Sequence, residues 1–348
     1  MKHKAVGLLS GGLDSILACR LMLEQGIEVL AVNFVSPFCT CTRAGCRHQA
    51  SKVAEELGIP LKVMPTGQEY IEMVKHPKHG RGGHMNPCID CRIFTFSRAR
   101  AYADEIGADF VFSGEVLGQR PMSQHLRAMM LIEEESGLKG RLLRPLSAGM
   151  LEPTEPELTG IVDRSKLPAI EGRSRKIQMD TAAGFGINDY PCPAGGCRLT
   201  DAQFAARLAE AFDYGEDTLP QIELLKYGRH FRLPNKAKVV AGRNQLENDA
   251  MRRLMFDGDI LLEAVDFLGP VTLLRRSSGE DDVRQAASVC ARYCDGRTEA
   301  FLKIRAGDLI MEVAPMTDSD LARIRIGEHI RARQEQKRAR FRTKVLSE

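Results

Sequence analysis

The chain has 348 residues, 43% of them hydrophobic, which is enough to bury a large core in two or three domains. The sequence shows no signal peptide, transit sequence or apolar run long enough to cross a membrane, so we expect a cytoplasmic protein with no membrane partner. In that reducing compartment the ten cysteines indicate metal, cluster or sulfur chemistry rather than structural disulfides. The formal net charge of +3 is small, but a small total can conceal a local basic patch.

The chain begins with the pattern of a strand, a glycine turn and a helix. An apolar run over Ala5–Leu9 predicts a buried strand, and the helix is expected from Asp14 onward. Two glycines in the turn let backbone N–H groups approach an anion, and the helix start adds the positive end of its dipole. No lysine follows the glycines, so the GxxxxGK[ST] nucleotide loop does not fit. An aspartate beside a phosphate requires a cation, which predicts Mg²⁺ bridging Asp14 to a polyphosphate.

This loop resembles the SGGxDS loop of the PP-loop ATP pyrophosphatases, which split ATP into AMP and pyrophosphate and leave a substrate oxygen adenylated. The resemblance implies an adenine nucleotide alpha hydrolase-like fold, ATP and Mg²⁺ as cofactors, and a catalytic role for Asp14. The residues that it implies for nucleotide binding are Ser10, Gly11, Gly12, Leu13, Asp14 and Ser15. From the residues alone, a plain glycine turn between a strand and a helix is the alternative.

Strands and helices alternate over the next hundred residues. The expected strands are 28–35, 61–64 and 109–113, and the expected helices are 47–57 and 93–106. Such alternation predicts an α/β fold with a doubly wound parallel sheet, in which ligands bind at the carboxyl ends of the strands. The glycine loop lies at such an end.

Three cysteines lie close together between the second and third strands. Cys39, Cys41 and Cys46 are soft ligands that one loop presents together, and His48 is a candidate fourth ligand for Zn²⁺. Unligated cysteines are the equal alternative.

A second pair, Cys88 and Cys91, forms a CxxC just before a predicted helix. The helix dipole is expected to lower the pKa of these thiols, and both sulfurs can reach one metal or one disulfide. A turn with two incidental cysteines is the alternative.

The stretch SGEVLGQRPMSQ, which begins at Ser113, is followed downstream by an Arg-Pro-Leu segment at 144–146. This combination resembles the catalytic domain of tRNA 4-thiouridine synthases. The resemblance implies an ATP and target-base site lined by Ser113, Gly114, Glu115, Gln119, Arg120, Ser123 and Gln124. An arginine there suits the negative charge that develops on phosphate. The alternative is a polar loop before a helix capped by Ser123.

Residues 151–180 are expected to form a connecting loop with short helices. The following turn, Tyr190 to Cys197, fixes Cys192 and Cys197 with two prolines and two glycines, and a helix over 200–212 follows it. In thiouridine synthases a reactive or cluster-binding cysteine lies at a comparable place. Which of the two cysteines takes that role stays open.

The thiols of Cys88, Cys91 and one of the later pair suit a 4Fe-4S cluster whose fourth iron carries a hydrosulfide. In the alternative, one thiol bears a persulfide that attacks the activated base and a second resolves it as a disulfide. The resemblance favours the cluster.

From about residue 221 the pattern changes to short strands with one long helix. The expected strands are 227–233, 237–241, 259–265, 271–275, 299–305 and 308–313, with a helix over 281–293. The segment Lys238–Met251 and the later string ASVCARYC resemble the NFACT-R RNA-binding module, which implies an α+β domain that binds RNA. Cys290 and Cys294 lie four residues apart on the helix, which favours core packing over ligation.

The resulting organisation is a PP-loop thiolation domain over 1–215, an RNA-binding domain over 221–316 and a basic helical tail over 317–348. Between Arg331 and Lys344 seven basic residues stand against one acid, a composition that binds phosphate backbones without reading sequence.

These features together predict an ATP-dependent tRNA sulfurtransferase of the 4-thiouridine type, with sulfide or a persulfide carrier as sulfur donor. The alternatives are a tRNA 2-thiouridylase, an adenylating ligase for a small molecule, and a non-enzymatic RNA- or ribosome-binding protein with a degenerate nucleotide domain. Homodimer formation stays open.

Overall fold

The structure is a computed structural model that describes residues 2–39, 45–190 and 196–328. It divides into two compact units, Met1–Thr200 and Asp201–Glu348. No helix in these ranges is long and apolar enough to span a membrane. The basic tail beyond residue 328 lies outside the described residues.

The first unit contains a five-stranded sheet in the order β3-β2-β1-β4-β5, and every pair of neighbours is parallel. Its strands are β1 (Lys4–Leu8), β2 (Glu28–Val35), β3 (Leu61–Pro65), β4 (Phe110–Ser113) and β5 (Leu142–Leu143). The predicted doubly wound parallel sheet is confirmed. The sequence pattern missed β5 because two residues are too few to show a period.

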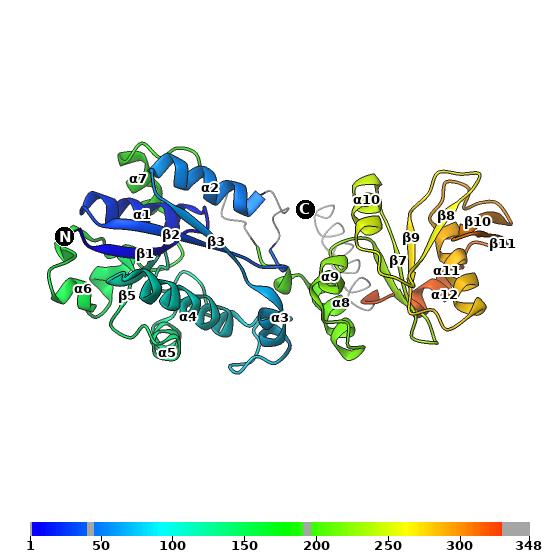
Figure 1. Cartoon of the computed structure of the whole chain (residues 1–348), viewed down its shortest axis with the longest axis horizontal. Helices are drawn as coiled ribbons and strands as arrows, with labels where there is room; N and C mark the ends of the chain where they lie inside the picture. Colours follow the sequence, from blue (N-terminus) through cyan, green and yellow to red (C-terminus); the bar gives the residue numbers. More distant parts are fainter. Residues whose placement is uncertain (1, 40–44, 191–195, 329–348) are drawn as a thin grey trace, which may run out of the picture. The chain divides into compact units, whose positions relative to one another are not determined.

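Helices cover both faces of this sheet (Figure 1). One face carries α1 (Leu13–Glu24), α2 (Gly45–Leu57) and α7 (Lys176–Gly184). The other carries α4 (Cys88–Ile106) and α5 (Leu126–Ser136), with α3 (Gly67–Lys75) packed against α4. The connecting segment contains the short elements η1 (Pro145–Met150), α6 (Glu155–Leu158) and η2 (Arg164–Lys166), and η3 (Arg198–Thr200) ends the unit.

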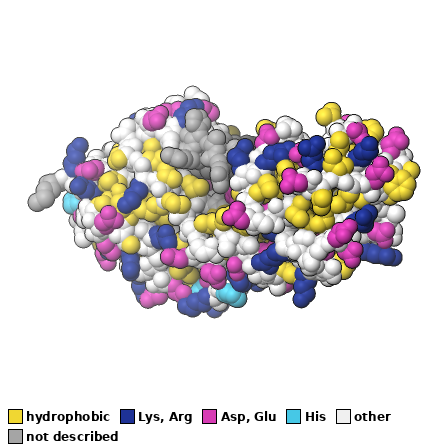
Figure 2. All heavy atoms as spheres, turned by 45° about the vertical axis from the view of Figure 1, so that its right-hand side comes forward, with side chains coloured by type: hydrophobic (Ala, Val, Ile, Leu, Met, Phe, Trp, Pro, Cys, Tyr) yellow, Lys and Arg dark blue, Asp and Glu magenta, His cyan; other side chains and the backbone are white. Residues whose placement is uncertain are grey.

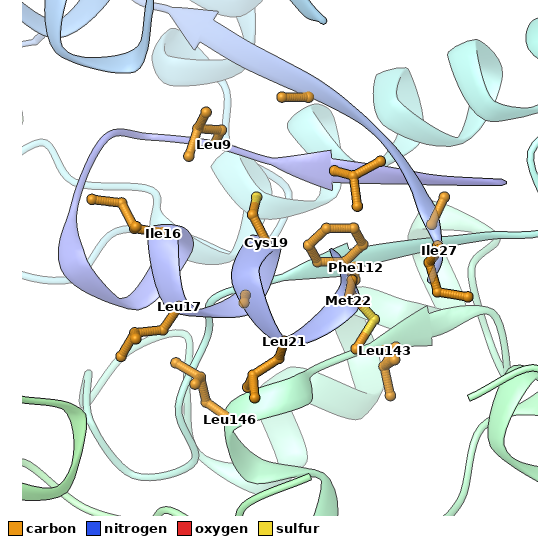
Figure 3. Close-up of a cluster of buried hydrophobic side chains, with 14 of the residues drawn as sticks. Leu9, Ile16, Leu17, Cys19, Leu21, Met22, Ile27, Phe112, Leu143 and Leu146 are labelled. Atoms are coloured by element: carbon orange, nitrogen blue, oxygen red, sulfur yellow. The ribbon is translucent and has the colours of Figure 1, made fainter. Parts of the chain in front are cut away.

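Strand alternation distributes the core between these two layers. On β1, Ala5 packs on the α1 side and Val6 on the α4 side. On β4, Phe112 packs on the α1 side and Val111 on the α4 side, as a period of two requires (Figure 3). The Phe112 ring lies directly over Gly7 of β1, where a Cβ would come within 2.4 Å of the ring. The strand that leads into the glycine loop is therefore held against β4.

Two local predictions in this unit were wrong. Helix α4 begins at Cys88 rather than at residue 93, so the CxxC forms its first turn instead of preceding it. A proline at 87 ends the preceding loop, and the apolar period becomes visible only one turn later. The N-cap of α5 is His125, whose Nδ1 accepts a hydrogen bond from the Ala128 N–H, whereas Ser123 is buried upstream.

The second unit contains a six-stranded antiparallel sheet in the order β11-β10-β8-β9-β7-β6. Its strands are β6 (Arg229–Arg232), β7 (Lys238–Ala241), β8 (Ile260–Ala264), β9 (Thr272–Arg275), β10 (Leu302–Ala306) and β11 (Leu309–Val313). Its helices are α8 (Ala202–Asp213), α9 (Leu219–Leu224), α10 (Gln245–Arg253), α11 (Glu280–Arg292) and α12 (Asp318–Ile324). The predicted α+β domain is confirmed.

Helix α11 covers one face of this sheet, and residues of α9 and α10 pack on the other. Cys290 and Cys294 are fully buried in the α11 core, as the sequence predicted. Helix α8, which the sequence placed in the first domain, belongs to the second unit. Arg232 of β6 explains this, because it bonds Glu210 of α8 at 3.1 Å and Glu216 at 2.9 Å in a part-buried network.

Candidate active site

The two sequence motifs of the first unit meet where the strand order of its sheet reverses. β1 and β4 are neighbours, and the chain leaves them in opposite directions, which places the loops after both strands at a topological switch point. Gly114, just after β4, passes so close to Asp14 that a Cβ there would lie 2.5 Å from the Asp14 carbonyl. Only glycine permits this approach. The glycine loop at Ser10 and the stretch that begins at Ser113 therefore form one site.

The glycine loop is held by a pair of serines. Ser15 Oγ donates to the Gly12 carbonyl at 2.8 Å and accepts from the Ser10 N–H at 3.2 Å. Gly11 adopts φ +79°, which favours glycine, and Gly12 is the N-cap of α1 but has no side chain to bond the N–H groups of the first turn. The first turn of α1 therefore presents backbone N–H groups to an anion. The Leu13 side chain is fully buried in the core, so only its backbone is available to a ligand.

Asp14 carries an oxygen that suits a cation. Gln119 Nε2 donates to Asp14 Oδ2 at 3.2 Å, which joins the two loops. Asp14 Oδ1 is buried and has no hydrogen-bond partner among the described residues. An orphaned carboxylate oxygen beside an open helix N-terminus fits Mg²⁺ bound together with a phosphate.

Asn33 on β2 is a polar residue that the sequence analysis did not single out. Its Nδ2 donates to the Leu9 carbonyl at 2.8 Å, at the start of the glycine loop, and its Oδ1 is buried without a partner in the described parts of the chain. A polar residue inside an otherwise apolar strand was the signal that could have identified it.

Glu115 lies between two arginines instead of facing an open site. Arg92 Nε lies 3.2 Å from one carboxylate oxygen, and Arg144 Nε donates to the other at 3.1 Å. Arg144 is almost completely buried and also pairs with Glu133 of α5. Burial disfavours the charge on Arg92, but the charges of Glu115, Cys91, Cys88 and Tyr70 together outweigh it and raise the pKa of Arg92. Glu115 thus positions Arg92 beside the thiols.

Arg120 lies at the edge of the same site. Partial burial and the charge of Arg92 lower the pKa of Arg120, while Cys88, Glu115 and Asp14 act in the opposite direction. The two arginines therefore bring positive charge to a region that contains both Asp14 and a thiol.

The CxxC is engaged by neighbouring polar groups. Cys88 Sγ donates to Asn86 Oδ1 at 3.1 Å, and the buried Tyr70 phenol donates to Cys91 Sγ at 2.9 Å. Burial raises the pKa of Cys91 despite the opposing effects of Arg92 and Tyr70. The expected lowering of its pKa by the helix dipole was therefore wrong for Cys91, because desolvation is the larger effect.

Cys197 joins this region from the end of the unit. A backbone bridge pairs it with Cys39, and the Arg198 N–H donates to the Phe38 carbonyl at 2.8 Å. Burial raises the pKa of Cys197 to about 12, and the charges of Cys91, Cys88 and Cys39 act in the same direction. Three segments distant in sequence thus bring their thiols within electrostatic reach of one another. The sequence analysis grouped Cys39 with Cys41 and Cys46, and its proximity to these other thiols was not predicted.

The described thiols do not form a finished metal site. Among residues 2–39, 45–190 and 196–328, no three His, Cys, Asp or Glu side chains are gathered closely enough to hold a metal ion. Cys192 and Cys41 lie outside the described residues, as do the side chains of Cys46 and His48. The cluster and zinc predictions are therefore not supported by a ligand set in this structure.

The parallel sheet, the glycine loop at its switch point and the orphaned carboxylate define a PP-loop type of nucleotide domain. Residues 1–150 match the family described as thiamine biosynthesis protein (ThiI), and residues 228–324 match the NFACT protein RNA binding domain. Residues 1–150 thus form a ThiI-like PP-loop domain, and residues 228–324 form an NFACT-type RNA-binding domain.

The relatives are tRNA-thiolating proteins. Over 121 residues the chain is 37% identical to the tRNA-specific 2-thiouridylase MnmA of Syntrophotalea carbinolica. The aligned region covers 32% of this chain and 34% of the relative. Over 143 residues it is 32% identical to a probable tRNA sulfurtransferase of Thermococcus kodakarensis, covering 41% and 36%. The chain thus spans about a third of the length of these curated relatives.

A solved structure of a 4-thiouridine synthetase bound to RNA and ATP resembles the chain with a TM-score of 0.38 and 22% identity. The similarity covers 64% of this chain and 52% of the other.

Proposed function

We propose that this protein is an ATP-dependent tRNA sulfurtransferase that adenylates a uridine carbonyl oxygen and replaces it with sulfur. The observation that carries the proposal is the meeting of three features at one switch point. These are the open glycine loop with Asp14, the loop after β4 with Gln119, and the thiols at the start of α4. Adenylation needs the first two, and sulfur transfer needs the third.

In the adenylation step, the uridine carbonyl oxygen attacks the α-phosphorus of ATP and pyrophosphate leaves. The α1 N-terminus and the glycine loop bind the phosphates. Asp14 would hold Mg²⁺, which would supply positive charge to neutralise the leaving pyrophosphate. Arg120 stabilises negative charge at the edge of the site.

In the second step a sulfur attacks the activated ring carbon, and AMP leaves with the former carbonyl oxygen. Cys88, Cys91 and Cys197, with Cys192 as the alternative to Cys197, hold this sulfur. In the persulfide route a persulfide carrier first transfers its outer sulfur to the nucleophilic cysteine. This outer sulfur forms the new C–S bond, and a second thiolate attacks the inner sulfur and releases the thiolated uridine. This step forms a disulfide, and a thiol reductant must restore the two thiols before the next turnover. A 4Fe-4S cluster would instead present a hydrosulfide, but the described thiols form no ligand set, and we derive no step through it.

We propose position 4 of the uridine ring as the site of thiolation, because the Gly114–Gln124 stretch and the Arg-Pro-Leu segment resemble those of the 4-thiouridine synthases. Thiolation at position 2 is the alternative hypothesis, and the similarity to the Syntrophotalea carbinolica protein supports it. RNA is bound by the second unit, and the basic tail adds phosphate contacts.

The test incubates anaerobically purified full-length protein with ATP, Mg²⁺, unmodified tRNA and either sulfide or a persulfide donor, and identifies the nucleosides by mass spectrometry. We expect a thiolated uridine together with AMP and pyrophosphate, and the retention time separates the 4-thio from the 2-thio isomer. AMP release without sulfur in the RNA would reject tRNA thiolation and favour the adenylating ligase. RNA binding without ATP cleavage would favour the non-enzymatic reading.

The matched variant is Asp14→Asn, which keeps the size of the side chain and removes its charge. We expect it to lose AMP formation while its affinity for tRNA stays near that of the wild type, because only Mg²⁺ binding is lost. A variant that still adenylates would remove Asp14 from the mechanism.

A further inference from the structure

The second unit contains a cavity that the proposed chemistry does not use. Its volume is about 560 Å³, and it is formed where β6, the end of α11 and α12 come together. Its charged lining consists of Arg229, Arg292, Arg297, Arg325, Asp318 and Glu328. Both signs of charge occur over the face shown in Figure 2. The cavity itself brings four arginines together with two carboxylates.

The carboxylates in this pocket do not hold its arginines firmly. Asp318 lies 2.7 Å from Arg292, but the Asp318 side chain is 84% exposed, and such surface pairs contribute little. Arg297 is exposed and makes no ion pair with the described residues. Both guanidinium groups are therefore available to an incoming anion at small cost.

The other two arginines, Arg229 and Arg325, both contact Tyr293. The Arg229 guanidinium lies over the Tyr293 ring, 4.4 Å from its centroid, and Arg229 Nη1 donates to the Gly242 carbonyl at 2.9 Å. Arg325 donates to the Tyr293 hydroxyl and lies 3.3 Å from Glu328. A guanidinium fixed flat on a ring is a planar surface on which a nucleobase stacks.

We propose that this arginine pocket binds a phosphate and the adjoining base of a single-stranded segment of RNA. The inference deepens the proposed function, because it identifies where the tRNA substrate is gripped. Four guanidinium groups match phosphate geometry, and the cavity is large enough for one nucleotide. Seven of the nine lining residues fall within residues 228–324, the range that matches an RNA-binding domain, which favours RNA over an acidic protein segment.

The test measures the affinity of the full-length protein for a fluorescent single-stranded RNA and for a tRNA transcript over a series of salt concentrations. Arg292→Gln and Arg297→Gln should each reduce the slope of log Kd against log salt by about 0.7, and the double variant by about 1.4. Arg297→Lys keeps the charge and should retain most of the slope. An oligonucleotide of equal charge without bases should bind about tenfold more weakly to the wild type.

Arg253→Gln is the matched control, because Arg253 is also exposed and basic but lies on α10 outside the pocket. It should leave both affinity and slope unchanged. The proposal is overturned if the double variant binds like the wild type, if Arg253→Gln loses as much, or if polyglutamate displaces RNA as effectively as unlabelled RNA. Absence of tRNA thiolation by the wild type would reject the proposed function but not the pocket, since the pocket is measured by RNA affinity alone.

Discussion

Replacing Glu115 by glutamine tests whether the buried ion network holds the candidate active site together. The side chains of Arg144 and Glu115 are 1% and 3% exposed, and their facing atoms are 3.1 Å apart. Removing one partner of such a pair leaves a buried charge without compensation, which costs about 3–5 kcal/mol. Arg144 keeps Glu133, and glutamine keeps one acceptor oxygen, so we expect the lower end of that range, about 3 kcal/mol.

The measurement is native-state hydrogen exchange read by mass spectrometry on peptides from β4 and α5. Peptides are needed because the chain has two units, and a single unfolding transition would not assign the loss to the first. A loss of about 3 kcal/mol accelerates exchange through global opening of this unit about 150-fold.

Glu134→Gln is the control, because it removes an exposed carboxylate from α5, the helix that also carries Glu133. Glu134 is 62% exposed and lies 2.7 Å from Lys139, and such a pair contributes at most about 1 kcal/mol. Exchange in Glu115→Gln within threefold of the wild type would show that the network contributes no net stability, and the assignment of Glu115 as a positioning residue would fall.

Two further predictions concern single cysteines. Tyr70→Phe should slow alkylation of Cys91 several-fold at mildly alkaline pH, measured by mass spectrometry of the labelled peptide. The hydrogen bond from Tyr70 favours the thiolate, so its removal raises the pKa of Cys91 further. Faster labelling would contradict this. Burial raises the pKa of Cys19 to about 12. When the pH exceeds the pKa of this thiol in the unfolded chain, the unfolded chain releases a proton that the folded chain keeps. The free energy of unfolding of the first unit should therefore fall by about 1.4 kcal/mol per pH unit between pH 9 and 12. Cys19→Ala should remove that part of the slope, whatever it costs in packing at neutral pH, and an unchanged slope would assign the alkaline loss to other groups.

The first four strands of the parallel sheet could be predicted because each strand carries its own signal. Apolar runs bounded by glycine or charge marked β1 to β4, and the bounds of β2 agree at both ends. The parallel arrangement followed from the alternation of strands with helices. The order of the strands then placed both loops at one switch point, which is why local strings were sufficient to locate the candidate site.

The contacts that complete the site could not be predicted in this way, because their partners lie far apart in the chain. Arg144 reaches Glu115 across 29 residues, and Tyr70 reaches Cys91 across 21. Neither pair has a spacing that any helix or strand period would reveal. The direction of the Cys91 pKa was missed for a related reason, since burial depends on tertiary packing, whereas a helix dipole is visible in the local sequence.

The raised thiol pKa values also provide a test of how sulfur is held. Cys91 and Cys197 are protonated at neutral pH, the latter with a pKa of about 12, and a thiol must lose its proton to ligate a metal. Reconstitution with iron and sulfide at pH 7.5 should therefore release about one proton per ligating cysteine, about three for a cluster, beyond the protons that iron and hydrosulfide release without the protein. Isothermal titration in two buffers of different ionisation enthalpy counts these protons, and Cys197→Ser should reduce the count by about one if Cys197 is a ligand. Saturation without proton release, or no binding at all, would instead support the persulfide route, in which these thiols act in turn rather than together.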